Sequence, residues 1–306
     1  MIISIKDNWK KAEKEHSAFL KKKIDSYLNG HTLLDVGPQR PSVYFLQKTS
    51  HLIMSFNEKD LLVAARYYVF FCNHLSSSDN NEAVDFFRSE LVKVFDYHNF
   101  INKKNSYDAY KLCDLSKTRT CPYCNHAYAF TILSDDGRGF RPTLDHFYPK
   151  DKYPHLALSL YNLVPSCSTC NSSLKGDIDF ARDSHLNPLF DKEVIKFRLE
   201  TSKSKSDISK LVDVNTQEFY IDLQHDGSVK SGNSMNTFIL ERRYQCFIYE
   251  AVGLAKHMIY LDDLRRNTQI DLTQDIDEPY ALMFDPGNYQ DFMLGKLLND
   301  VYKQFS

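Results

Sequence analysis

Four cysteines in two Cys-x-x-Cys pairs carry the clearest chemical signal in this chain of 306 residues. The first pair is Cys121 and Cys124, and the second is Cys167 and Cys170. Each pair offers two thiolates from one tight turn, and two such turns supply the four sulfur ligands of a closed tetrahedral zinc site. Soft sulfur ligands favour zinc over magnesium or calcium. A redox Cys-x-x-Cys occurs singly beside a βαβ pattern, which this sequence lacks. We therefore predict one structural zinc ion.

A second group of polar residues lies between and directly after the cysteine pairs. Asp145 and His146 are adjacent in the segment TLDHFYPK, and Asn162 and Asn171 precede and follow the second pair. Carboxylate and amide oxygens are ligands that Mg²⁺ prefers, and Mg²⁺ keeps several waters while it is bound by one or two protein groups. A neutral histidine beside such an ion can deprotonate a water, which then attacks phosphorus. These residue types are those of a metal-dependent phosphodiester hydrolase.

Short elements must position these side chains. We expect the Asp145-His146 pair at a strand end or loop, where successive side chains diverge, so that one can face the metal and the other the attacking water. If zinc fixes Cys170 at the start of a helix, Asn171 lies in the first turn with little freedom. The zinc site would then present the second ligand of the catalytic metal.

The remainder of the chain has the composition of a globular, mainly helical protein. Hydrophobic residues make up 42%, and Gly and Pro number ten each, which argues against disorder and against a loop-rich β fold. Helical patterns cover 8–28, 58–75, 82–101, 236–266 and 288–304, and β-prone stretches cover 126–133, 197–200 and 219–228. Polar stretches at 76–81 and 202–207 predict a helix cap and a solvated loop. We predict an α+β fold with a helical region at 1–105, a zinc-stapled central unit at 106–190 and a mainly helical region at 191–306 with a short β element.

The composition also bears on location and partners. No apolar stretch approaches the roughly 20 residues that a helix needs to span a bilayer, and the N-terminus turns charged at once, without an apolar core of signal-peptide length. We expect a cytoplasmic protein with no membrane partner, in which Cys72, Cys113 and Cys246 are buried structural thiols. The net charge of −2 would not attract nucleic acid as a whole, so any such contact must be local or supplied by a partner.

The motifs resemble those of an HNH nuclease of the His-Me finger, or ββα-metal, class, which implies that the central unit at 106–190 is a ββα-metal unit stapled by zinc. They are CPYC at 121–124, LDHFYPK at 144–150, YNLVPSC at 161–167 and CNSSLKG at 170–176. The resemblance implies that His146 is the general base that activates water, and that Asp145 binds a catalytic Mg²⁺ or Mn²⁺. It implies that Asn162 orients the histidine ring and braces the loop. Asn171 would be the terminal metal ligand, a position where family members often have histidine.

Two lysines occupy positions where such nucleases carry basic residues toward the scissile backbone. These are Lys150 and Lys175. The alternative is that they are solvated surface lysines. His126, His155 and His185 have no role in the family, and we expect them to be structural or exposed.

The flanking segments are similar to those of bacterial HNH proteins encoded beside an ATPase in antiphage defence, of the Septu type and its retron-associated forms. TFILERRY at 237–244 and GKLLNDVYKQ at 295–304 are examples. This chain has no G-x-x-x-x-G-K-[ST] motif, so it is not the ATPase itself. The resemblance implies an effector nuclease that acts on DNA and has an ATPase partner, and that can be silent until the partner docks. The alternative is a non-catalytic zinc-ribbon module that binds nucleic acid or helps to assemble a complex.

Overall fold

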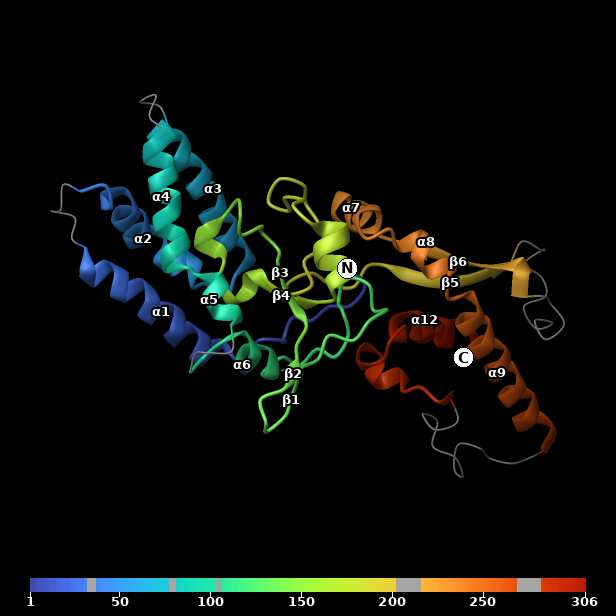
Figure 1. The fold of residues 1–306 in the computed structure, drawn as a ribbon. Helices are drawn as coiled ribbons and strands as arrows, with labels where there is room; N and C mark the ends of the chain where they lie inside the picture. Colours follow the sequence, from blue (N-terminus) through green and yellow to red (C-terminus); the bar gives the residue numbers. More distant parts are fainter. Residues whose placement is uncertain (32–36, 77–80, 103–105, 202–215, 269–281) are drawn as a thin grey trace. The chain divides into compact units, whose positions relative to one another are not determined.

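The computed structural model describes residues 1–31, 37–76, 81–102, 106–201, 216–268 and 282–306 (Figure 1). They fall into two compact units. One, here called the hairpin unit, comprises residues 5–117 and 129–190; the other, the tail unit, comprises residues 1–4, 118–128 and 191–306. The described residues form helices and three two-stranded antiparallel sheets, which confirms the predicted α+β class. The three-segment division of the sequence stays a prediction.

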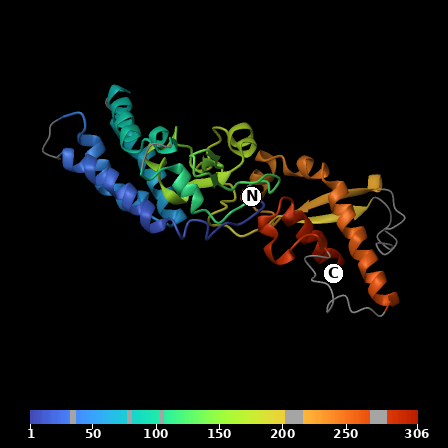
Figure 2. The same ribbon diagram turned by 60° about the horizontal axis from the view of Figure 1, so that its bottom comes forward.

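Four helices lie side by side at the start of the hairpin unit (Figures 1 and 2). They are α1 (Glu13–Gly30), α2 (Arg40–Ile53), α3 (Glu58–Ser76) and α4 (Asn81–Val94). Phe45 of α2 packs against Phe71 of α3 and Phe87 of α4, with ring centroids 5.5 and 5.3 Å away. The aromatic stripes of the sequence are therefore core, and α2 is a helix that the sequence patterns did not predict.

Two short helices follow, and each begins at an aspartate cap. In α5 (Tyr97–Ile101) the Asp96 carboxylate accepts a hydrogen bond from the Asn99 amide, and in α6 (Ala109–Asp114) the Asp108 carboxylate accepts two. Such bonds satisfy amide groups that have no partner within the helix. The predicted helix at 82–101 is thus two helices, because Asp96 ends one and starts the next.

Two hairpins, a π-helix and the 3₁₀ turns η1 (Pro154–Leu156) and η2 (Leu160–Asn162) follow in the hairpin unit. Strands β1 (Ile132–Leu133) and β2 (Gly139–Phe140) form the first hairpin, and β3 (Thr143–His146) pairs with β4 (Leu163–Ser166) in the second. The π-helix η3 covers Thr169–Lys175, directly after β4. The order of β3, β4 and η3 along the chain is strand, strand, helix.

The tail unit packs helices on one long hairpin. Strand β5 (Lys196–Thr201) pairs with β6 (Phe219–Gln224). The described helices are the 3₁₀ segment η5 (Thr216–Glu218), α7 (Val229–Thr237), α8 (Leu240–Gln245), α9 (Ile248–Thr268), the 3₁₀ segment η6 (Pro286–Asp291) and α12 (Gly295–Phe305). The prediction of one helix over 236–266 is wrong. Ile239 takes a left-handed conformation with φ of 50°, and the chain breaks again between α8 and α9.

Other expectations have mixed outcomes. Cys113 is buried and Cys72 half-buried, whereas Cys246 is exposed, so the prediction of a buried thiol is wrong there. Cys246 follows the C-terminal turn of α8, on a stretch that faces solvent. None of the described helices is long and apolar enough to cross a membrane. The predicted loop at 202–207, and most of the predicted cap sequence at 76–81, lie outside the described residues.

Candidate active site

The candidate catalytic pair lies at the end of the second hairpin. Asp145 and His146 are the last residues of β3 and pair in register with Val164 and Leu163 of β4. Both side chains are buried, with 1% and 7% of the residue exposed. Successive residues of a strand point to opposite faces of the sheet. The expectation of a strand end or loop is therefore met, and the side chains of Asp145 and His146 point to opposite faces of the hairpin.

His146 is held by one hydrogen bond and one aromatic contact. Its Nε2 lies 2.9 Å from the carbonyl oxygen of Ala157. A carbonyl only accepts, so Nε2 carries the proton and Nδ1 has the free lone pair. The Tyr97 ring lies edge-on to the imidazole with centroids 4.4 Å apart. Burial lowers the pKa of His146 from 6.5 to about 4, so the ring is neutral at neutral pH, as a general base must be.

Asn162 is a fully buried brace for the loop between the two strands. Its Oδ1 accepts from the Tyr148 amide at 2.7 Å, and its Nδ2 donates to the carbonyls of Tyr148 and Leu156 at 3.0 Å each. All of its amide hydrogen-bonding groups thus act on the segment that precedes Ala157. Asn162 fixes the loop, and the bond that fixes the His146 ring comes from the Ala157 carbonyl on that loop.

Lys175 reaches Asp145 from the end of the π-helix. Its Nζ lies 2.9 Å from Asp145 Oδ1, donates to the His146 carbonyl at 2.7 Å, and lies 4.9 Å from the centre of the Phe180 ring. Both charged side chains are 2% exposed. A π-helix inserts an extra residue per turn relative to an α-helix, and such turns are frequent at functional sites. Lys175 therefore points inward and is not a solvated surface lysine.

A cavity of about 250 Å³ brings the candidate residues together. Asp145, His146, Lys150, Asn171 and Lys175 all line it. Lys150 is at the rim, with its side chain 40% exposed and its Nζ 2.7 Å from Asp151 Oδ1. The carboxylate of Asp145 and the amide of Asn171 are oxygen donors on one cavity, a set that suits Mg²⁺ or Mn²⁺ with several waters. Asn162 is fully buried and does not line this cavity.

Each cysteine pair forms a tight turn with an amide directed at sulfur. The Cys170 amide donates to Cys167 Sγ at 3.4 Å, and the His126 amide donates to Cys124 Sγ at 3.4 Å. Such bonds favour the thiolate form that binds a metal. The four sulfur atoms lie within 4.8 Å of one another. This confirms the predicted four-cysteine cluster, which can bind one zinc ion.

Three features of the site were not foreseen from the sequence. Tyr97 contacts His146 from a helix far earlier in the chain, the Ala157 carbonyl binds its Nε2, and Lys175 pairs with Asp145. No spacing in the sequence points to Tyr97 or to a backbone carbonyl. The LKG sequence at 174–176 could have indicated that Lys175 ends a helix, since Gly176 has a positive φ of 47°. The three unassigned histidines pack against aromatic rings: His126 against Tyr244, His155 against Tyr68, His185 against Phe180.

These features define an α+β protein with a four-cysteine cluster and a polar cavity at a strand end. The chain is similar to Septu protein PtuB of Bacillus thuringiensis, with 44% identity over 48 residues that make up 16% of this chain and 18% of that protein. It is also similar to protein ea31 of Escherichia phage lambda, with 29% identity over 102 residues, 32% of this chain and 31% of that protein. The matches thus span about a fifth and about a third of these curated relatives. No family model and no solved structure matches.

Proposed function

We propose that this protein is a metal-dependent HNH endonuclease that hydrolyses phosphodiester bonds in DNA, as the effector of a bacterial antiphage defence complex in the cytoplasm. The observation that carries the proposal is the shared cavity, which is lined by a neutral, buried imidazole, a carboxylate and an amide. The partial similarity to Septu protein PtuB supports the defence role. An ATPase encoded nearby is the partner that we propose on the same ground.

His146 acts as the general base in this proposal. Its Nε2 proton is fixed on the Ala157 carbonyl, so Nδ1 takes the proton of the attacking water. Asp145 and Asn171 would hold the Mg²⁺ or Mn²⁺, which, when bound, stabilises negative charge on the leaving oxygen and lowers the pKa of bound water. The ring stays aligned because Asn162 holds the loop and Tyr97 packs on the imidazole.

Lys150 acts at the rim of the cavity and Lys175 acts inside it. Lys150 at the rim meets the phosphate backbone of an approaching strand, where its charge can be shared with Asp151 or with a phosphate oxygen. Lys175 inside the cavity keeps the Asp145 carboxylate oriented through Oδ1. A scissile phosphate that enters the cavity also meets this ammonium group.

The cysteine cluster has a structural role in this proposal. Cys121, Cys124, Cys167 and Cys170 hold one zinc ion, and four sulfur ligands leave no coordination position for water. Asn171 directly follows the last of these ligands. Zinc therefore limits the positions that the Asn171 amide can take.

A non-catalytic zinc-ribbon module is the second candidate. The observation that favours it is the Lys175–Asp145 ion pair, because a lysine already neutralises the carboxylate without any metal. Such a protein would bind nucleic acid or help to assemble a complex.

A cleavage assay separates the two candidates. Purified full-length protein, alone and with the product of its neighbouring ATPase gene, is incubated with supercoiled plasmid in the presence and absence of Mg²⁺ or Mn²⁺. The nuclease proposal expects nicked or linear plasmid only when the divalent ion is present. If plasmid is bound but stays intact under every one of these conditions, the zinc-ribbon module is the better account.

A further inference from the structure

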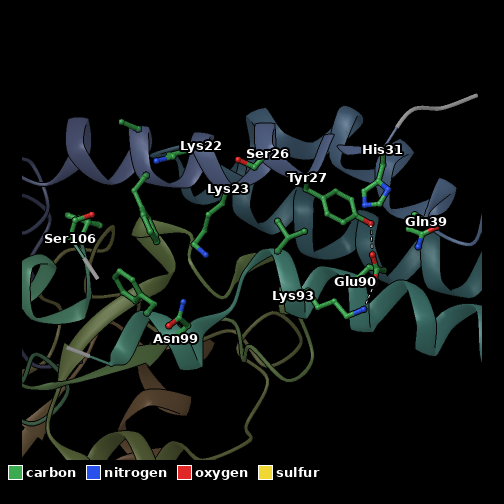
Figure 3. Close-up of a pocket in the computed structure, with 15 residues that line it drawn as sticks. Lys22, Lys23, Ser26, Tyr27, His31, Gln39, Glu90, Lys93, Asn99 and Ser106 are labelled. Atoms are coloured by element: carbon green, nitrogen blue, oxygen red, sulfur yellow. Dashed lines mark hydrogen bonds and ion pairs between the residues drawn. The ribbon is translucent and has the colours of Figure 1, made fainter. Parts of the chain in front are cut away.

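A second and larger cavity lies in the hairpin unit between helices α1, α4 and α5. Its volume is about 950 Å³, and Figure 3 shows the side chains that line it. None of the residues proposed for catalysis lines this cavity. Its size is in the range of sites that bind small organic ligands.

Lysines from facing helices make one side of the cavity positive. Lys22 and Lys23 come from α1, and Lys93 comes from α4. Lys93 is paired with Glu90 at 2.6 Å, whereas Lys22 and Lys23 have no carboxylate partner among the residues that the structure describes. Lys23 points from α1 into the space between the helices (Figure 3). Two ammonium groups are thus available to an anion.

Aromatic rings lie next to these lysines. Phe19 is 5.5 Å from Phe100 and 5.2 Å from Tyr107, centroid to centroid, and all three line the cavity. The Nζ of Lys23 is 5.4 Å from the centre of the Phe19 ring. Phe100 and Tyr107 are buried and Phe19 is half-buried, so a planar apolar group can pack on the Phe19 ring, at the edge of this cluster, while an attached anion reaches the lysine. Aromatic faces beside positive charge are the combination that binds nucleotides with little preference for the base.

Glu90 places a negative charge at one end of the cavity. It is 5% exposed, and its carboxylate accepts hydrogen bonds from the Tyr27 hydroxyl at 2.9 Å and from Lys93. A phosphate is repelled at this end of the cavity and favoured at Lys22 and Lys23.

We propose that this cavity binds one nucleotide, with its phosphate groups at Lys22 and Lys23 and its base against Phe19, Phe100 and Tyr107. The nucleotide is either free in solution or one unit of a bound single strand. An acidic peptide matches the lysines but leaves the aromatic cluster unused. This binding site does not depend on the proposed nuclease function.

A nucleotide bound in the cavity would affect the candidate active site through α5. Phe100 lines the cavity, while Tyr97 of the same five-residue helix packs on His146. This consequence does rest on the proposed function. The binding test below uses no divalent ion and measures no cleavage, so that its failure is separate from a failure of the nuclease proposal.

Binding is measured by fluorescence anisotropy with full-length protein and three labelled probes: ATP, a ten-nucleotide single strand of DNA, and a poly-glutamate peptide. The double variant Lys22→Glu/Lys23→Glu should weaken nucleotide binding by about tenfold or more, since it reverses two charges that meet phosphate. Lys21→Glu is the matched control, because this exposed lysine is on the same helix and does not line the cavity. Saturable binding of ATP would show that the ligand is a free nucleotide. Binding of the DNA strand without binding of ATP would show that the ligand is one unit of a single strand.

A second comparison tests the aromatic contact. In the wild-type protein, unlabelled ATP should displace the labelled nucleotide probe at a lower concentration than pyrophosphate does. This difference between ATP and pyrophosphate should disappear in Phe19→Leu, which keeps an apolar side chain without the ring. The proposal is overturned if neither nucleotide probe binds, if Lys21→Glu weakens binding as much as the double variant, or if poly-glutamate binds as tightly as the nucleotides.

Discussion

His16 and His146 bind neighbouring carbonyl groups of one loop. The Nε2 of His16 lies 2.7 Å from the Leu158 oxygen, and the Nε2 of His146 lies 2.9 Å from the Ala157 oxygen. His16 comes from α1 and His146 from the end of β3, so one short stretch of backbone fixes both rings. Helix α1 therefore helps to fix the loop whose Ala157 carbonyl holds the candidate base.

The first prediction concerns the brace of this loop. Asn162→Ala removes three buried hydrogen bonds and leaves the Tyr148 amide without its side-chain acceptor. We expect a loss of about 2–4 kcal/mol in the free energy of unfolding. Chemical denaturation measures it, and Asn73→Ala, an exposed position on α3, is the control that should stay within about 0.5 kcal/mol of the wild type. Equal stability of the two variants would show that the brace contributes nothing.

The second prediction concerns Asp145, which we propose as a metal ligand. Lys175→Met keeps an unbranched side chain against Phe180 but removes the ammonium group that lies 2.9 Å from the buried Asp145 carboxylate, and breaking this buried ion pair should cost about 3–5 kcal/mol. If Asp145 binds a divalent ion, Mg²⁺ should raise the melting temperature of this variant, because a ligand that binds only the folded state stabilises it. The double variant Lys175→Met/Asp145→Asn should lose this Mg²⁺ response. A melting temperature that is independent of Mg²⁺ in Lys175→Met would argue against Asp145 as a ligand.

The third prediction concerns pH. Burial lowers the pKa of His16 from 6.5 to about 4. Its unfolded form takes up a proton as the pH falls through 6.5, while its folded form stays neutral until about pH 4. The unfolded state thus binds more protons between pH 6.5 and pH 4. The free energy of unfolding is therefore highest above pH 6.5 and decreases as the pH falls toward 4, by at most about 1.4 kcal/mol per pH unit for one histidine.

Two further histidines add to this slope. Burial also lowers the pKa of His146 to about 4 and that of His155 to about 3. Urea denaturation from pH 7.5 to 4 measures the slope in the wild type and in His16→Gln, where it should be smaller. An unchanged slope in the variant would mean that His16 does not titrate in this way.

The fourth prediction concerns the cysteine cluster. Cys167→Ser should lose bound zinc and lower the stability of the protein, since the free energy of binding a structural zinc ion is part of the free energy of folding. Cys246→Ser is the matched control, because that thiol is exposed and outside the cluster. Zinc content by mass spectrometry and melting temperature test both variants. A Cys167→Ser protein that keeps one zinc ion per chain would contradict the prediction.

The sequence predicted the parts of the site that depend on local spacing. Two Cys-x-x-Cys pairs predict a cluster wherever they lie, because each turn presents both thiols, and the four cysteines do lie together. The expectation that the adjacent side chains of Asp145 and His146 must diverge likewise indicated a strand end or loop, and these residues do end β3. Contacts made across the chain could not be read in this way. Tyr97 reaches His146 only because α5 packs near β3, and the periodicity of its segment gives no such partner.

Helix breaks were the weak point of the fold prediction. The helical pattern predicted over 236–266 includes Ile239, yet the backbone there is left-handed, and a pattern of side chains does not report a change of backbone direction. The orientation of Lys175 could not be predicted for a similar reason. Its inward orientation follows from the π-helix, whose wider turn is not visible in the residue types.

The most direct measurement is plasmid cleavage in the presence of Mg²⁺ by His146→Ala and by His98→Ala, each with its zinc content and folding verified. His98 is exposed on the same helix as Tyr97, so its variant controls for the loss of an imidazole near the site. We predict that His146→Ala lowers the rate by about 10²–10⁴-fold, the usual contribution of a general base, while His98→Ala cleaves at the wild-type rate. A folded, zinc-loaded His146→Ala protein that cleaves as fast as the wild type would contradict the assignment of His146 as the base.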